Sequence, residues 1–186
     1  MEHEQPTRRR YRPVLGVSGL TLFICLLLPF ARTCRRDEVE LTLPTLWAPY
    51  LFGALFCVLS AVRSPRATRA VVRLLHTVSY LFVGGAVLVT LWAPAIGLIE
   101  LVVAAIITIA LGNNPRESRL AATTIIIGAL WTAWFAFLST FEDSLYGVRV
   151  ALVASVGILG SALLWRYDIA LGRPEEPVPR AVARKR

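Results

Sequence analysis

The chain has 186 residues, of which 56% are hydrophobic and 17% charged, and it carries a formal net charge of +8. Long uncharged runs separated by short charged clusters are not typical of a soluble domain of this size. The basic residues gather at the ends of these runs, on no single amphipathic face and beside no nucleic-acid-binding motif, which argues against nucleic acid as a partner. The composition therefore indicates an integral membrane protein.

Six apolar runs have about the length, roughly 17–25 residues, that an α-helix needs to cross a bilayer. They cover residues 13–31, 46–62, 74–92, 95–111, 120–138 and 145–165. One helix over 74–111 would be about 57 Å long at 1.5 Å per residue, so we expect a tight turn at Pro94. The predicted fold is an all-α, polytopic membrane helix bundle at 13–166, between basic cytoplasmic tails at 1–12 and 167–186.

A five-residue motif occurs twice in the chain. Thr-Leu-Trp-Ala-Pro stands at 45–49 and again at 90–94, and Pro-Arg-rich segments follow at 65–69 and 115–119. Pro49 and Pro94 suit the first turn of a helix, while Trp47 and Trp92 suit a membrane interface. The repeat predicts three similar hairpins that all enter the membrane from the same side.

The basic residues divide unevenly between the two ends of the predicted spans. Most lie in the two tails and in the loops after the second and fourth spans, so the positive-inside rule places both termini in the cytoplasm. Arginines beside membrane helices attract anionic headgroups by about 1 kcal/mol each. We expect such contacts from the loop residues Arg63, Arg66, Arg69, Arg73, Arg116 and Arg119. Because Lys185 is the only lysine and alanine and valine abound, a GC-rich bacterial gene, and hence the inner membrane, is favoured.

Glu100 is the only acidic residue inside an apolar run, about one turn into the fourth. An ionisable side chain within a membrane is costly and is a functional-site hypothesis by default. It would act as a coupling residue for a proton or cation if it faced the bundle interior. The alternative is a hydrated carboxylate at headgroup level.

Residues 16–19 read Gly-Val-Ser-Gly, the GxSG form found in rhomboid-type intramembrane serine proteases. A serine nucleophile needs a base, and His76 is the only histidine outside the N-terminal tail. The order of spans and the residues around His76 depart from that family. The alternative interpretation treats Ser18 as a small packing residue and His76 as an interfacial one.

Small residues repeat every four positions along the fifth span, at Thr124, Gly128, Thr132 and Ala136. Such residues let helices approach closely, either inside one bundle, which we favour, or in a homo-oligomer.

The sequence holds no standard metal, nucleotide or cofactor motif, and its three cysteines form no metal-binding pattern. We therefore expect no cofactor, no metal and no enzyme activity. The leading hypothesis is a small subunit or scaffold of a membrane complex, with a membrane-protein partner or as a homo-oligomer. The alternative is a small transporter or channel that uses Glu100, and the third is a serine hydrolase that uses Ser18 and His76.

Overall fold

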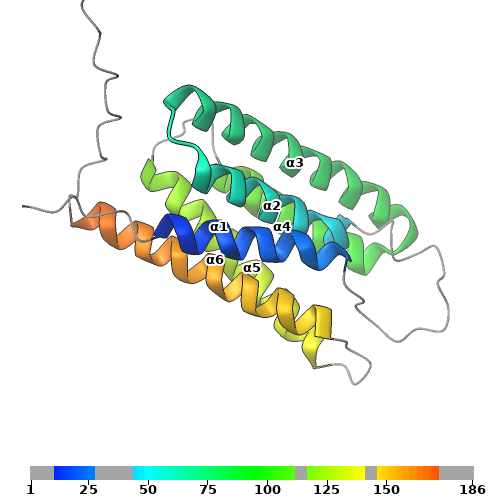
Figure 1. The fold of residues 1–186 in the computed structure, drawn as a ribbon. Coiled ribbons are helices and arrows are strands. Elements are labelled where there is room, and N and C mark those ends of the chain that lie inside the picture. The colour runs from blue at the N-terminus through cyan, green and yellow to red at the C-terminus, as the bar shows by residue number, and fades with distance from the viewer. Residues whose placement is uncertain (1–10, 28–43, 112–116, 141–145, 172–186) are drawn as a thin grey trace, which may run out of the picture.

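The computed structural model describes residues 11–27, 44–111, 117–140 and 146–171, and this part of the chain is helical without strands (Figure 1). The elements are α1 (Tyr11–Ile24) with a short 3-10 turn (Cys25–Leu27), α2 (Pro44–Ala61), α3 (Pro65–Trp92), α4 (Pro94–Leu111), α5 (Glu117–Ser139) and α6 (Tyr146–Ala170). The predicted all-α architecture with six helices is confirmed.

Four of the helices contain segments long and apolar enough to cross a membrane. These segments are Arg66–Leu91, Pro94–Leu111, Glu117–Ser139 and Tyr146–Ala170. The apolar helices at Tyr11–Leu27 and Trp47–Ala61 are shorter. A membrane protein is thus supported, while six complete crossings, the hairpin repeat and the orientation of the termini stay predictions.

The start of α3 differs from the predicted boundary, because the helix begins at Pro65 instead of position 74. Ser64 is the residue before the first helical turn, and its backbone is extended. Pro65 follows in that first turn, where its missing N–H costs nothing. Arg66, Arg69 and Arg73, which the sequence placed in a loop, are therefore exposed residues of this helix. The apolar run marks only the part of the helix suited to the hydrocarbon core.

The two copies of the repeated motif adopt different local structures. Pro94 begins α4, and a tight turn at Ala93 separates it from α3, as predicted. Pro49, in contrast, lies inside α2, which begins at Pro44. Its predicted position in the first turn is wrong because Pro44, another residue suited to a helix start, takes that place.

Glycines set the distances between α1, α2, α5 and α6. An added methyl group at Gly19 would lie 2.6 Å from the carbonyl oxygen of Gly53, so the backbones of α1 and α2 are in contact. Gly157 of α6 packs against Ser18 of α1, and Gly128 of α5 packs against Leu159 of α6. The Gly128 face of the fifth span is thus an interior contact, as we favoured.

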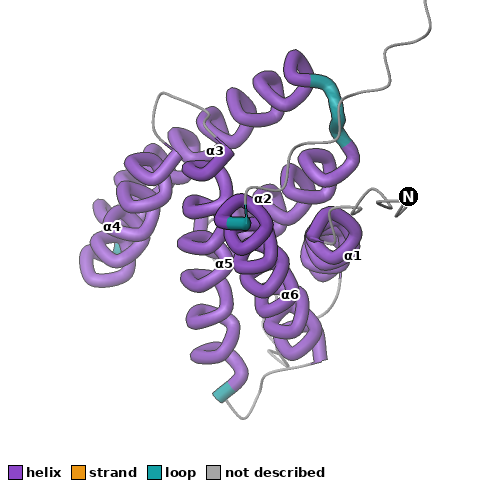
Figure 2. The backbone as a smooth tube through the Cα atoms, turned by 90° about the vertical axis from the view of Figure 1, so that its left-hand side faces the viewer, coloured by secondary structure: helices purple, strands orange, loops and turns teal. Residues whose placement is uncertain are grey.

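An aromatic cluster joins α2, α3 and α5 in the core. The ring of Trp131 lies 6.3 Å from that of Phe52 and 6.1 Å from that of Phe82. Figure 2 shows α3 and α4 on one side of the bundle, with α1 and α6 on the other. Trp131 therefore links the α3–α4 hairpin to the remaining helices.

Replacing Gly19 by alanine should destabilise the protein by about 1–3 kcal/mol, because a methyl group there overpacks the α1–α2 contact. Reversible unfolding in mixed micelles measures the effect. Gly84→Ala is the matched control, since nothing lies within 4 Å of an added methyl group at that position. Equal stability of the two variants would contradict the close approach of α1 and α2.

Candidate functional site

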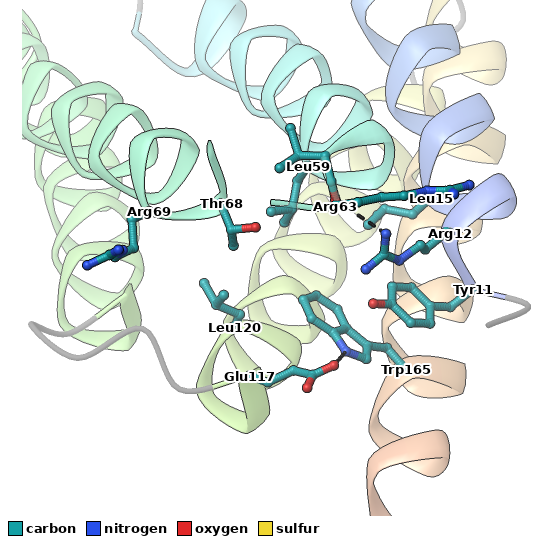
Figure 3. A pocket seen from close by; sticks show the side chains of 11 residues that line it. Tyr11, Arg12, Leu15, Leu59, Arg63, Thr68, Arg69, Glu117, Leu120 and Trp165 are labelled. Atoms are coloured by element: carbon teal, nitrogen blue, oxygen red, sulfur yellow. Dashed lines mark hydrogen bonds between the residues drawn. The ribbon is translucent and has the colours of Figure 1, made fainter. Parts of the chain in front are cut away.

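A cavity of about 320 Å³ lies at one end of the bundle, where five helix ends meet. The starts of α1, α3 and α5 and the ends of α2 and α6 surround it (Figure 3). Its lining residues are Tyr11, Arg12, Leu15, Leu59, Val62, Arg63, Thr68, Arg69, Glu117, Leu120 and Trp165. Residues far apart in the sequence thus meet around a cavity that both polar and apolar side chains line.

One wall of the cavity is an aromatic pair. The rings of Tyr11 and Trp165 stack with centroids 4.8 Å apart and planes 7° from parallel. Both side chains are buried, and the indole Nε1 of Trp165 donates a hydrogen bond of 2.9 Å to Oε1 of Glu117. This contact fixes the first turn of α5 to the last turns of α6.

Arg12 brings a cationic group into the cavity from the first turn of α1. Its side chain is half-buried, and its Nη1 donates a hydrogen bond of 3.3 Å to the backbone carbonyl of Val62. This carbonyl lies just past the end of α2, where helix carbonyls need partners outside the helix. Figure 3 shows the Arg12 guanidinium beside the Tyr11 ring, whereas the charged ends of Arg63 and Arg69 point away from the cavity on opposite sides.

The arginines predicted to contact headgroups separate into two groups. Arg63 and Arg69 line the cavity. Arg66, Arg73 and Arg119 are also exposed but do not line it, and Arg116 lies outside the described residues. Contact of these arginines with lipid headgroups stays a prediction.

Glu100 is buried inside the bundle, with 1% of its surface exposed. It shares the buried face of α4 with Gly97, Ala104, Ile107 and Leu111. The alternative of a fully hydrated carboxylate at headgroup level therefore does not fit the structure. At 1.5 Å per residue, Glu100 lies about 9 Å along the axis from Pro94, at the end of α4 remote from the cavity.

Ser18 and His76 are not brought together. Ser18 of α1 packs against Gly157 of α6, which fits the packing role that the sequence left open. His76 of α3 stacks on Tyr80 of its own helix, with centroids 6.3 Å apart. Within the described part of the chain, no three His, Cys, Asp or Glu residues form a metal-binding group.

The repeat residues lie away from the cavity. Trp47 is half-buried and packs against the core, and Trp92 ends α3, with its side chain outside the described part. Tyr11, Arg12 and Glu117 were not singled out from the sequence. The available signals were the position of Tyr11 and Arg12 at the start of a helix and that of Glu117 in a first helical turn. Neither signal reveals which distant residue the side chain contacts.

Comparison with known proteins adds no functional assignment: no protein-family model, no curated protein and no solved structure matches the chain.

The hydrogen bond from Trp165 to Glu117 is tested by Trp165→Phe, which keeps an aromatic ring beside Tyr11 but removes the donor. We expect a loss of about 1–2 kcal/mol of stability, as for a hydrogen bond to a charged group with some access to water. Thermal unfolding in detergent measures it. Trp134→Phe, the same change on the half-buried Trp134 of α5, is the control; an equal loss in both variants would contradict a specific role for the Glu117 contact.

Proposed function

We propose that the chain is a non-enzymatic integral membrane protein that acts as a small subunit or scaffold of a membrane complex. The proposal includes both termini on the cytoplasmic side and a bacterial inner membrane as its location. It also includes the three-hairpin repeat as the origin of the fold.

The observation that carries this proposal is the uneven burial of the membrane-spanning segments. The buried share of the apolar segment is 44% in both α5 and α6, but only 22% in α3 and 28% in α4. α3 and α4 pack mainly on each other, with smaller contacts from α3 to α2 and from α4 to α5. The α3–α4 hairpin therefore offers the most apolar helix surface to a membrane-embedded neighbour.

Purification in mild detergent should yield a stoichiometric membrane-protein partner. A triple alanine variant of the exposed α4 residues Leu98, Val102 and Ile109 should lose the partner without loss of yield. The matched control replaces the exposed α6 residues Val153, Val156 and Leu164 by alanine, and it should retain the partner. Mass spectrometry of the purified material measures both. Purification of the wild-type chain alone would contradict the subunit hypothesis.

A second candidate, a small transporter or channel, is favoured by one observation, the burial of Glu100. A carboxylate on the inner face of a membrane helix is costly, so its presence there is a functional-site hypothesis by default. In this proposal Glu100 binds a proton or cation during transport.

Glu100→Gln tests the transport hypothesis, because the amide keeps the shape of the side chain but cannot exchange a proton. In liposomes that contain only this chain, we expect the variant to lose at least tenfold in ion or proton flux, and Glu100→Asp to retain part of it. Flux is measured with an entrapped indicator dye. Wild-type flux in the glutamine variant would exclude Glu100 as the coupling residue.

A further inference from the structure

Glu100 lies on a face of α4 that is otherwise apolar. Its side chain is 1% exposed, and the other buried residues of that face are Gly97, Ala104, Ile107 and Leu111. Leu98 and Val102, on the opposite side of the same helix, are exposed and suited to contact with lipid. The carboxyl group is thus enclosed by the bundle within a membrane-length apolar helix, where a charged side chain is costly.

The charged and titratable side chains of the neighbouring helices gather far from Glu100. On α3 and α5, which pack on α4, the described residues of this kind are Arg66, Arg69, Arg73, His76, Tyr80, Glu117 and Arg119. Gly97 packs against Thr90, which lies about 15 Å along α3 beyond Tyr80 at 1.5 Å per residue. Tyr50 of α2 packs beside Phe135 of α5 and is uncharged at neutral pH. An ionised Glu100 would therefore lie far from the described arginines of α3 and α5.

The surroundings of Glu100 do not resemble the coordination shell of a metal cation. Hard cations such as calcium and magnesium bind about six or more oxygen ligands. The buried face of α4 offers glycine and aliphatic side chains, and the described residues include no group of three His, Cys, Asp or Glu. The hydroxyl of Thr90, beside Gly97, donates to the carbonyl of Ala86. A proton, in contrast, requires only one oxygen of the carboxylate.

We propose that Glu100 holds a proton in the packed bundle, so that its side chain is a neutral carboxylic acid and its ligand is a proton instead of a metal cation. The inference rests on the second candidate function above, in which Glu100 takes a proton or cation, and narrows that choice. Protonation forms an O–H bond at one carboxylate oxygen with a proton from water, and it removes the charge that burial makes costly. A neutral carboxylic acid both donates and accepts hydrogen bonds, so this state is compatible with polar contacts of Glu100.

Infrared spectroscopy of the full chain in liposomes at pH 7 tests the proposal, because a protonated carboxyl group has a C=O stretching band that a carboxylate lacks. We expect this band in the wild-type protein and its loss in Glu100→Gln. Glu117→Gln, the same change in the first turn of α5, is the matched control and should keep the band. Absence of the band from the wild-type protein would overturn the proposal without reference to any variant. A band of equal intensity in the wild type and in folded Glu100→Gln would also overturn it.

Titration with sodium, potassium and calcium separates a proton from a metal cation as the ligand. The band should keep its intensity at pH 7 when each cation is added at millimolar concentration. Loss of the band on addition of one of them would overturn the proton as the ligand.

The infrared and flux measurements distinguish this inference from the transport hypothesis. The Glu100 band in a chain without flux would support the proton site and contradict transport. Flux that depends on Glu100 in a chain without the band would overturn the neutral carboxylic acid and leave transport standing.

Discussion

The close approach of α1 to both α2 and α6 is the contact on which the remaining architecture depends. α1 packs on both helices: Gly19 brings its backbone against that of α2, and Gly157 of α6 leaves room for the side chain of Ser18. In a bilayer, apolar surface alone gives helices little reason to associate, so close packing of this kind supplies much of the attraction. The same contacts bring the start of α1 beside the end of α6, where Tyr11 stacks on Trp165. The cavity wall is thus a consequence of helix packing.

The core and the bundle end illustrate two ways of placing polar groups in a membrane protein. The buried hydroxyls of Thr124 and Ser155 donate to carbonyls of their own helix, at Leu120 and Ala151, so the cost of burying them is small. One hydroxyl also ties neighbouring helices, because Thr123 of α5 donates to the carbonyl of Ala110 in α4 at 2.7 Å. Charged groups, in contrast, gather at the helix ends, and Glu100 is the exception that makes α4 chemically distinct.

The sequence predicted the apolar elements well because hydrophobicity over a membrane-length segment is a local property. It failed at the start of α3, since Arg66, Arg69 and Arg73 continue the helix beyond its apolar part. It also missed the pairing of Trp165 with Glu117, residues 48 positions apart. Helix packing determines such a contact, and no local pattern encodes which helix end meets which. The burial of Glu100 was equally undetermined, because the apolar run gives its depth but not the direction it faces.

The separation of the two polar sites bears on the choice between a scaffold and a transporter. Glu100 lies roughly 17 Å along α4 from Leu111, whose end of the helix is tied to the start of α5 near the cavity. The fully buried side chains of Leu75, Ile107 and Ile127 occupy the intervening levels of α3, α4 and α5. Passage of a proton or cation between Glu100 and the cavity would require these side chains to separate. Packed interiors resist such a change unless the helices have a second stable packing arrangement. Transport that joined Glu100 to the cavity would therefore demand movement of the α3–α4 hairpin, whose two apolar segments are less buried than those of α5 and α6.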